Sequence, residues 1–174
     1  SRSASRLGPA VAYAAMTALV VALGGIALVR APNPPREGCQ HLHGLSSPAE
    51  VKFDRQGIPH VRAGTEEDAY RVLGWLHAAD RLFQMETRRR AAAGRLSEVF
   101  GAAAIEMDTE ARTLGLGPQA EREFRALSVA DLRLLEAYAA GVNAYVSSHR
   151  RPWELVALDT PAAASSIPPR KGAP

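Results

Sequence analysis

The chain has 174 residues, of which 47% are hydrophobic, 22% charged and 6% aromatic, and its formal net charge is +3. This length leaves room for one domain, and the apolar fraction excludes a collagen-like or wholly disordered chain. The net charge is too small to indicate a nucleic-acid-binding protein, and the single cysteine excludes an internal disulfide and a site of several thiolates.

The N-terminal part of the chain is predicted to be a membrane or export segment. Residues 7–29 carry no charge and follow Arg2 and Arg6. A helix needs about 20 apolar residues to cross a bilayer, and basic residues before it keep the N-terminus in the cytoplasm. We interpret residues 1–30 as a single-pass signal anchor or a cleaved export signal, a buried soluble helix being the alternative. Either of the first two places the following domain on the extracytoplasmic side (periplasmic or extracellular) of the cell membrane.

Two segments are predicted to lack regular structure. Residues 31–48 are a Pro-rich linker, and residues 159–174, with four prolines and mostly small side chains, are a disordered tail. Residues 49–158 remain as the folded region. The linker holds three potential metal ligands without a fourth, which we interpret as solvated side chains: Cys39, His41 and His43.

The folded region is predicted to begin with a β ribbon and a long helix. Residues 50–54 alternate in polarity, residues 55–57 form a turn, and residues 58–63 return as a second strand. Thr65 can then cap a helix that continues to about Ala91.

Charged side chains on the long helix are expected to pair locally. His77 and Asp80 lie three residues apart and can meet on one face, and Glu86 can meet Arg89 or Arg90. We interpret the first pair as a structural hydrogen bond rather than half of an acid–base site.

Shorter helices are predicted to follow. Gly94 interrupts the long helix, and Gly101 ends a short one after it. Pro118 opens the next helix, and Ser128 caps the last, which stops before Pro152. The side chains expected to face inward on the last two helices are Ala120, Phe124 and Leu127, and then Leu132, Leu135, Ala139, Val142 and Val146.

Known catalytic motifs do not explain the chain. A charged, salt-bridged loop is predicted at residues 108–112, and Arg88 to Arg90 fan around their helix instead of forming one phosphate-binding face. The sequence has no phosphate-binding loop, zinc-protease motif or serine-hydrolase elbow. The residues alone therefore name no reaction.

A dense set of fixed residue types nevertheless runs from residue 51 to residue 101. It reads D-x-x-G-I-P-H-x-x-A, then G-x-x-x-A-x-D-R-L-x-Q-M-E-x-x-R-R, then G-x-x-x-E-x-x-G. This pattern resembles the start of the penicillin acylase (penicillin amidase) family, and residues 138–144 resemble a later family motif. The positions that we interpret as structural members of the pattern are Asp54, Gly57, Pro59, His60, His77, Asp80, Arg81, Gln84, Glu86, Arg89, Gly94 and Glu98.

The resemblance implies a fold and an activity. The fold class implied is α+β. Residues 49–158 would be the mainly helical α-chain portion of an N-terminal-nucleophile hydrolase of αββα fold, with one short β ribbon. An N-terminal transmembrane helix would precede this portion. Family members are exported amide hydrolases whose precursor cuts itself into an α and a β chain. The N-terminal Ser of the β chain attacks the amide, and its own α-amino group is the base. Substrates in the family include penicillins, cephalosporins, other N-acyl compounds and acyl-homoserine lactones.

The resemblance also implies what this chain does not supply. The nucleophile, the oxyanion hole and the calcium ligands of some family members come later in the precursor, so we expect no catalytic, cofactor-binding or metal-binding residue here. The chain departs from the family pattern after Tyr145, where Trp153 arrives early and the Pro/Ala tail follows.

We therefore expect an N-terminal fragment that is inactive without the β chain of the same precursor. Its partners would be that chain and, through residues 7–29, the membrane, but no nucleic acid. Its apolar stripes, Leu76 with Phe83 and Leu135 with Val142, would rest on a sheet of the β chain. The alternatives are a non-catalytic, membrane-tethered interaction module that reuses the α-chain fold and, less favoured, a basic nucleic-acid or lipid-surface binder.

Overall fold

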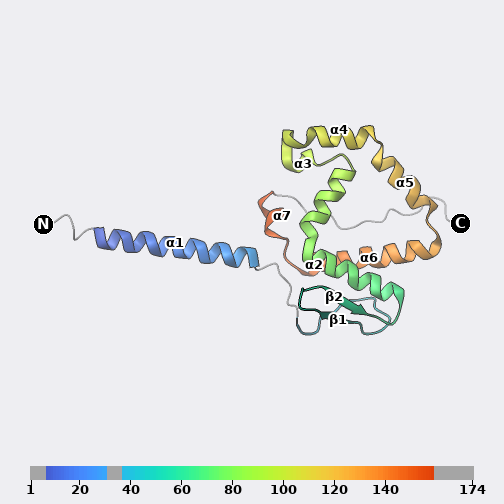
Figure 1. Ribbon diagram of the computed structural model, residues 1–174, viewed down its shortest axis with the longest axis horizontal. Coiled ribbons are helices and arrows are strands. Elements are labelled where there is room, and N and C mark those ends of the chain that lie inside the picture. Colours follow the sequence, from blue (N-terminus) through green and yellow to red (C-terminus); the bar gives the residue numbers. More distant parts are fainter. Residues whose placement is uncertain (1–6, 31–36, 159–174) are drawn as a thin grey trace. The chain divides into compact units, whose positions relative to one another are not determined.

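The computed structural model describes residues 7–30 and 37–158 (Figure 1). The chain divides into two units, Ser1–Asn33 and Pro34–Pro174, and each is described by itself. The predicted tail and residues 31–36 of the predicted linker lie outside the described residues.

The first unit contains helix α1, Leu7–Arg30, which confirms that this segment is helical. Val11, Leu19 and Val21 on this helix are exposed. Among the residues described, no helix is long and apolar enough to cross a membrane, so the structure gives no support to the span expected over residues 7–29.

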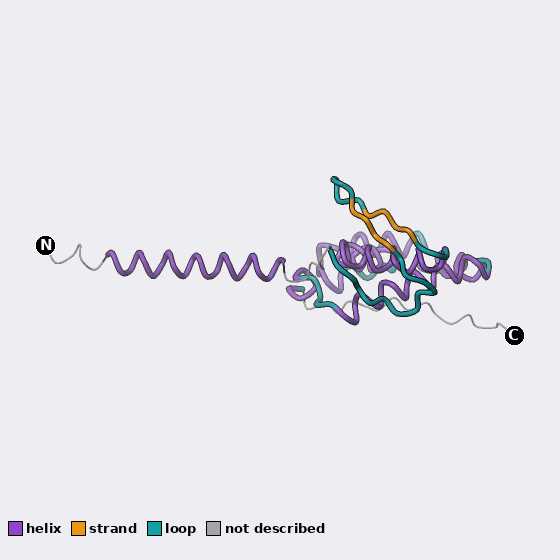
Figure 2. Tube along the Cα trace, turned by 90° about the horizontal axis from the view of Figure 1, so that it is seen from below, coloured by secondary structure: helices purple, strands orange, loops and turns teal. Residues whose placement is uncertain are grey.

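The second unit begins with the predicted β ribbon, drawn in orange in Figure 2. Strands β1 (Glu50–Phe53) and β2 (Pro59–Arg62) are antiparallel, and Phe53 lies opposite Pro59 in the register. Pro59 opens its strand, where its missing N–H interrupts no ladder. Gly57 adopts φ 81°, a left-handed conformation that the tight turn requires and that glycine adopts without strain.

Two long helices form the centre of this unit. Helix α2 spans Glu66–Ala92 and helix α6 spans Val129–Ser148, and they pack along each other (Figure 1). A Cβ atom at Gly74 would collide with the backbone carbonyl of Tyr138 on α6. A Cβ atom at Gly141 would collide with the carbonyl oxygen of Arg71 on α2 and lie 2.9 Å from the backbone nitrogen of Trp75. Two glycines, one on each helix, therefore permit the two backbones to touch.

The hydrophobic core lies beside this crossing. Ala78 and Leu82 from α2 pack with Val142 and Tyr145 from α6. A five-residue helix that the sequence did not predict, α7 (Trp153–Ala157), adds Leu155, which is 1% exposed. The core is thus closed by a residue that follows Pro152, beyond the last predicted element.

Helix α2 is not continuous, contrary to the prediction of one helix to about Ala91. Arg81 adopts φ −145° and ψ 34°, which divides α2 into two helical halves. Kinks usually occur at proline or glycine, and neither stands there, so the sequence carried no local signal for it. The end of the helix agrees with the prediction, because Gly94 takes φ 63° just beyond α2.

Four further helical segments connect α2 to α6, the last of them α5 (Leu116–Ala126). A short helix α3 (Ser97–Phe100) and a 3-10 turn η1 (Gly101–Ala104) lead into α4, Ile105–Thr113. The prediction of a loop at residues 108–112 is therefore wrong: these residues lie within α4, because the helical turn η1 after Gly101 leads the chain directly into that helix.

Helix α5 (Leu116–Ala126) lies where the sequence predicted a helix, but its side chains are more exposed than predicted. Ala120 is exposed, and Phe124 and Leu127 are only half-buried, although all three were expected to face inward. No residue of α5 is buried.

The residues of the two predicted apolar stripes also differ in how far they are buried. Leu76 and Val142 are buried within this chain alone, so they are not available to the sheet of a partner. Phe83 is half-buried against the core, whereas Leu135 is 39% exposed. The expectation that both stripes rest on a partner's sheet is thus wrong for Leu76 and Val142, because packing inside this chain already buries them.

Replacing Gly141 with alanine is expected to destabilise the chain. The added methyl group must push α2 and α6 apart, and overpacking of this kind costs about 1–3 kcal/mol or more. The matched control is Gly117→Ala on α5, where a Cβ atom meets nothing within 4 Å. That change is expected to alter the free energy of unfolding by less than about 1 kcal/mol, because the helix preference of alanine is opposed by its place before Pro118. Urea unfolding of both variants checks the prediction, and equal midpoints would contradict it.

Candidate functional site

The first group of family-pattern residues closes the β ribbon. Asp54 Oδ1 accepts hydrogen bonds from the backbone N–H groups of Gln56 and Ile58, each at 2.9 Å. Asp54 Oδ2 lies 3.3 Å from Nε2 of His60. The bond from Ile58 and the contact with His60 hold the pKa of Asp54 below its ordinary value. Asp54 and His60 therefore fix a turn and have no geometry that suggests catalysis.

The second group lies at the kink of α2. His77 was expected to meet Asp80, but Nδ1 of His77 instead lies 3.0 Å from the hydroxyl oxygen of Tyr138 on α6. Asp80 pairs with the neighbouring Arg81 at 2.9 Å. The physical reason is the non-helical backbone at Arg81 together with the closeness of α6, which brings Tyr138 to His77. Burial and the charge of Arg81 lower the pKa of His77, so the imidazole favours its neutral form.

The third group is a network of charges at the C-terminal end of α2. Arg89 donates two hydrogen bonds to Glu86, at 2.9 and 2.8 Å. Arg90 Nε donates to Oε1 of Glu86 at 2.7 Å, and Arg90 Nη1 donates to Glu98 of α3, also at 2.7 Å. Arg95 holds the other side of Glu98 at 2.6 Å. The prediction that Glu86 meets Arg89 or Arg90 is confirmed for both arginines.

Glu86 and Arg90 are buried, so part of this network lies inside the domain and not on its surface. Burial by itself raises the pKa of Glu86, but the hydrogen bonds and charges of Arg89 and Arg90 outweigh it and hold that pKa below its ordinary value. A buried pair of this kind is costly to break from one side, because the remaining charge has lost its partner. The network fastens α3 to the end of α2.

Asp108, which was expected in a charged surface loop, is instead a buried carboxylate that orders the same region. Asp108 Oδ1 accepts from the backbone N–H of Leu96 at 2.7 Å, and Oδ2 accepts from the backbone and hydroxyl of Ser97 at 2.8 and 2.6 Å. Burial alone raises the pKa of Asp108, but these bonds and the charge of Arg112 bring it below the ordinary value. Only the fold of α4 back onto the start of α3 gives this carboxylate its backbone partners, so its role comes from the tertiary structure.

Gly94 and Gln84 complete the pattern. Besides its positive φ, Gly94 is packed so closely that a Cβ atom would lie 2.6 Å from Cγ of Arg112. The guanidinium of Arg112 donates to the carbonyl of Gly94 at 2.8 Å. Gln84 is exposed on α2. Gly94 therefore supports the backbone just beyond the end of α2.

A further carboxylate ties the predicted linker to the domain. Asp68, in the first turn of α2, is buried and accepts from the backbone and the hydroxyl of Ser46. Thr65 caps the helix as predicted, accepting from the backbone N–H of Asp68 at 3.1 Å. The end of the linker is therefore held against α2.

The described residues do not assemble a nucleophile with its base. Ser148 Oγ lies 2.9 Å from Nδ1 of His149, but it also contacts the carbonyl of Ala144 at 2.6 Å. The ring of His149 stacks on Tyr145 at 4.3 Å. Nucleophilic catalysis needs a base that is itself oriented by a third group, and the carbonyl contact makes Ser148 a residue of the helix end instead. Within residues 37–158, no group of three or more His, Cys, Asp and Glu could hold a metal ion.

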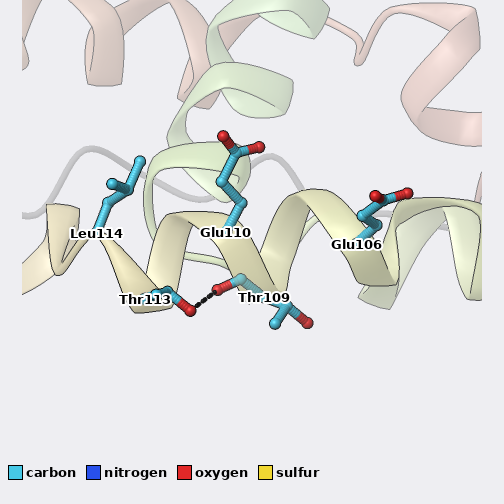
Figure 3. Close-up of a pocket in the computed structure, with 5 residues that line it drawn as sticks. All are labelled: Glu106, Thr109, Glu110, Thr113 and Leu114. Carbon is cyan, nitrogen blue, oxygen red and sulfur yellow. Dashed lines mark hydrogen bonds between the residues drawn. The ribbon is translucent and has the colours of Figure 1, made fainter.

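A shallow hollow on α4 is lined by Glu106, Thr109, Glu110, Thr113 and Leu114 (Figure 3). The hydroxyl of Thr113 donates to the carbonyl of Thr109 at 2.7 Å, and Thr109 donates likewise to Ile105 at 2.8 Å. The hydroxyl protons are thus used within the helix, and all five residues come from one stretch of chain. This hollow has the composition of a helix surface and not of an active site.

Known proteins resemble much of this chain. The family model described as Penicillin amidase matches residues 48–167. The Penicillin acylase 2 proenzyme of Pseudomonas sp. (strain SE83) is 48% identical over 120 residues, which are 69% of this chain and 16% of that protein. The acyl-homoserine lactone acylase QuiP of Pseudomonas aeruginosa is 41% identical over 117 residues, 67% of this chain and 14% of its own length. The chain thus spans about one sixth of the curated relatives that it matches.

A solved structure shows the same fold. A thermostable penicillin G acylase from Alcaligenes faecalis superposes with a TM-score of 0.58 at 33% sequence identity, over 66% of this chain and 64% of that one. The mainly helical architecture with a two-stranded ribbon is therefore shared with that enzyme.

Changing Asp108 to asparagine is expected to loosen the start of α3. Asparagine keeps the size of the side chain, but its NH2 group replaces one of the two acceptors that face the N–H groups of Leu96 and Ser97. We expect a lower urea midpoint and faster hydrogen exchange at these two amides. Glu106→Gln, an equivalent change at an exposed position of the same helix, is the control. Equal exchange in both variants would show that Asp108 orders nothing.

Stability is expected to fall in acid partly through Glu86. Its pKa in the folded chain lies below the ordinary 4.5, so its contribution is present above pH 4.5 and is lost as the pH falls through the folded value. Glu86→Gln should therefore lower the free energy of unfolding by about 3 kcal/mol at pH 7. The urea midpoint of this variant should also decline less steeply than that of the wild type as the pH falls below 5. Glu106→Gln again serves as the control. A decline as steep as that of the wild type would exclude Glu86 as its source.

Proposed function

We propose, from the fact that this chain belongs to the penicillin amidase family, that it supplies the N-terminal, α-chain portion of an amide hydrolase. The observation that carries this proposal is the match itself: it covers residues 48–167 here but only 16% of the SE83 proenzyme. In this proposal the portion acts as scaffold, since its family-pattern residues hold turns, caps and helix ends.

The reaction proposed for the complete enzyme is hydrolysis of a linear amide bond in an N-acyl compound. The names of two relatives support it, since one is a penicillin acylase proenzyme and the other an acyl-homoserine lactone acylase. The nucleophile would then be the N-terminal residue of a β chain from the same precursor, which is the partner that a proenzyme relative suggests. β-Lactam antibiotics with an acyl side chain are within this substrate class.

We also propose that the folded unit works on the extracytoplasmic side of the cell membrane. The uncharged run at residues 7–29, preceded by Arg2 and Arg6, supports this location because it has the character of an export segment. A reporter that is active only after export, fused after residue 158, would test it.

A second function is favoured by one structural observation. Tyr145 and Leu155 are each 1% exposed, so the α2–α6–α7 core closes without any partner. A non-catalytic interaction module that reuses the α-chain fold would need such self-sufficiency.

Mixing two parts of an enzyme distinguishes the two functions. The full chain alone is expected to hydrolyse neither penicillin G nor an N-acyl-homoserine lactone. Co-expression with the region of the SE83 proenzyme that follows the matched segment should restore hydrolysis above the level of that region alone. Gly141→Ala, which separates α2 from α6, should restore less, and Gly117→Ala should restore as much as the wild type. Hydrolysis by the chain alone would contradict the scaffold role, and no gain on co-expression would favour the interaction module.

A further inference from the structure

The segment just before the β ribbon is held in place by a buried carboxylate. Asp68, in the first turn of α2, is 3% exposed. Its Oδ1 accepts a hydrogen bond from the backbone N–H of Ser46 at 2.9 Å, and its Oδ2 accepts one from the hydroxyl of Ser46 at 2.5 Å. The hydroxyl and backbone of Ser46, with further bonds from Thr65 and Ser47, hold the pKa of Asp68 below its ordinary value. The carboxylate is therefore ionised at neutral pH, and hydrogen bonds to an ionised acceptor are the strong ones.

Close packing continues on both sides of Ser46. A Cβ atom at Gly64, in the loop before α2, would lie 2.3 Å from Oγ of Ser47, so Ser47 occupies the space that a side chain would need. Gly44 adopts φ 84°, and a Cβ atom there would lie 3.0 Å from Nη1 of Arg71 on α2. We call residues 43–47 the clasp, because they lie against both the start of α2 and the loop before it.

The two ends of the clasp are held with unequal strength. Nη1 of Arg71 donates to the carbonyl of His43 at 3.5 Å, which is the upper limit for a hydrogen bond. Nε of Arg71 is buried and has no hydrogen-bond partner among the residues that the structure describes. Ser46, by contrast, donates two bonds to one ionised carboxylate. Local opening from the N-terminal side is thus easy up to Gly44 and is stopped at Ser46.

We propose that the folded unit begins at the clasp, and that proteolytic removal of the preceding segment stops before Ser46. This inference rests on the proposed export of the unit, since the export segment at residues 7–29 is what such processing would remove. An external protease hydrolyses a peptide bond only where the chain opens locally, so the cut follows the opening of the clasp and not the exposure of single residues. The clasp therefore sets how much of the chain before the β ribbon a processed protein keeps.

Limited proteolysis of the full chain with thermolysin, which cuts on the N-terminal side of leucine, tests this boundary. Leu42 precedes the clasp and Leu45 lies within it, and both are half-buried, so exposure by itself does not distinguish them. In the wild-type chain we expect cleavage before Leu42 to be at least about tenfold faster than cleavage before Leu45, as read from the masses of the products.

Two variants and a matched control connect the boundary to Asp68. Asp68→Asn should speed cleavage before Leu45 at least about tenfold, the effect of losing a charge-assisted hydrogen bond. Glu67→Gln, the same loss of one charge at the exposed neighbouring position, should leave the rate unchanged. Ser46→Ala, at an exposed position, removes one of the two donors without touching the core and should give an intermediate rate. This variant keeps the test decisive even where Asp68→Asn does not fold.

Hydrogen exchange separates opening of the clasp from unfolding of the whole unit. The amide of Ser46 should exchange at least about tenfold faster in Asp68→Asn than in the wild type, while amides of α6 near Val142 stay equally slow in both.

The outcomes distinguish this inference from the proposed function. Equal cleavage before Leu42 and Leu45 in the wild type, or no acceleration in Asp68→Asn and Ser46→Ala, would overturn the clasp and leave the proposed function intact. Sequencing the N-terminus of an exported, processed chain adds a second criterion: a terminus at or before Ser46 agrees with the inference, and a later one overturns it. A chain that is never exported would contradict the proposed location alone, because thermolysin cleavage does not depend on export.

Discussion

Helices α2 and α6 cross with their backbones in contact, where Gly74 meets the backbone of Tyr138 and Gly141 meets the backbone of Arg71. Because no side chain separates the helices there, neighbouring residues interlock: His77 reaches Tyr138, and Trp75 packs edge-on against Tyr145 at 5.6 Å. A close-packed interior tolerates an added methyl group poorly, so this crossing fixes where the core forms and where the later helices begin.

Beyond the crossing of α2 and α6, hydrogen bonds between charged side chains and to the backbone hold the helices together. The second half of α2 still supplies Leu82 to the core and ends in the network of Glu86, Arg90 and Glu98. Asp108 then holds the start of α3 through backbone N–H groups. Arginine suits this task because its planar guanidinium can bind two carboxylates at once, as Arg90 does. The fixed residue types that mark the family here thus mostly hold turns, caps and helix ends.

The chain combines a closed part with an open part. The α2–α6–α7 core buries Tyr145 and Leu155 internally, whereas α5 has no buried residue. The core by itself is therefore compatible with an interaction module as well as with a scaffold.

The sequence by itself determined the elements whose signals are local. The ribbon at residues 50–63, the Thr65 and Ser128 caps and the pairing of Glu86 follow from alternation, capping chemistry and helical spacing, and the family pattern gave the fold class. Tertiary structure decided the partner of His77, the kink at Arg81 and the roles of Asp108, Leu155 and the exposed α5. Each of these depends on segments distant in sequence meeting in space: a helical periodicity states which side chains share a face, but only packing states what that face touches.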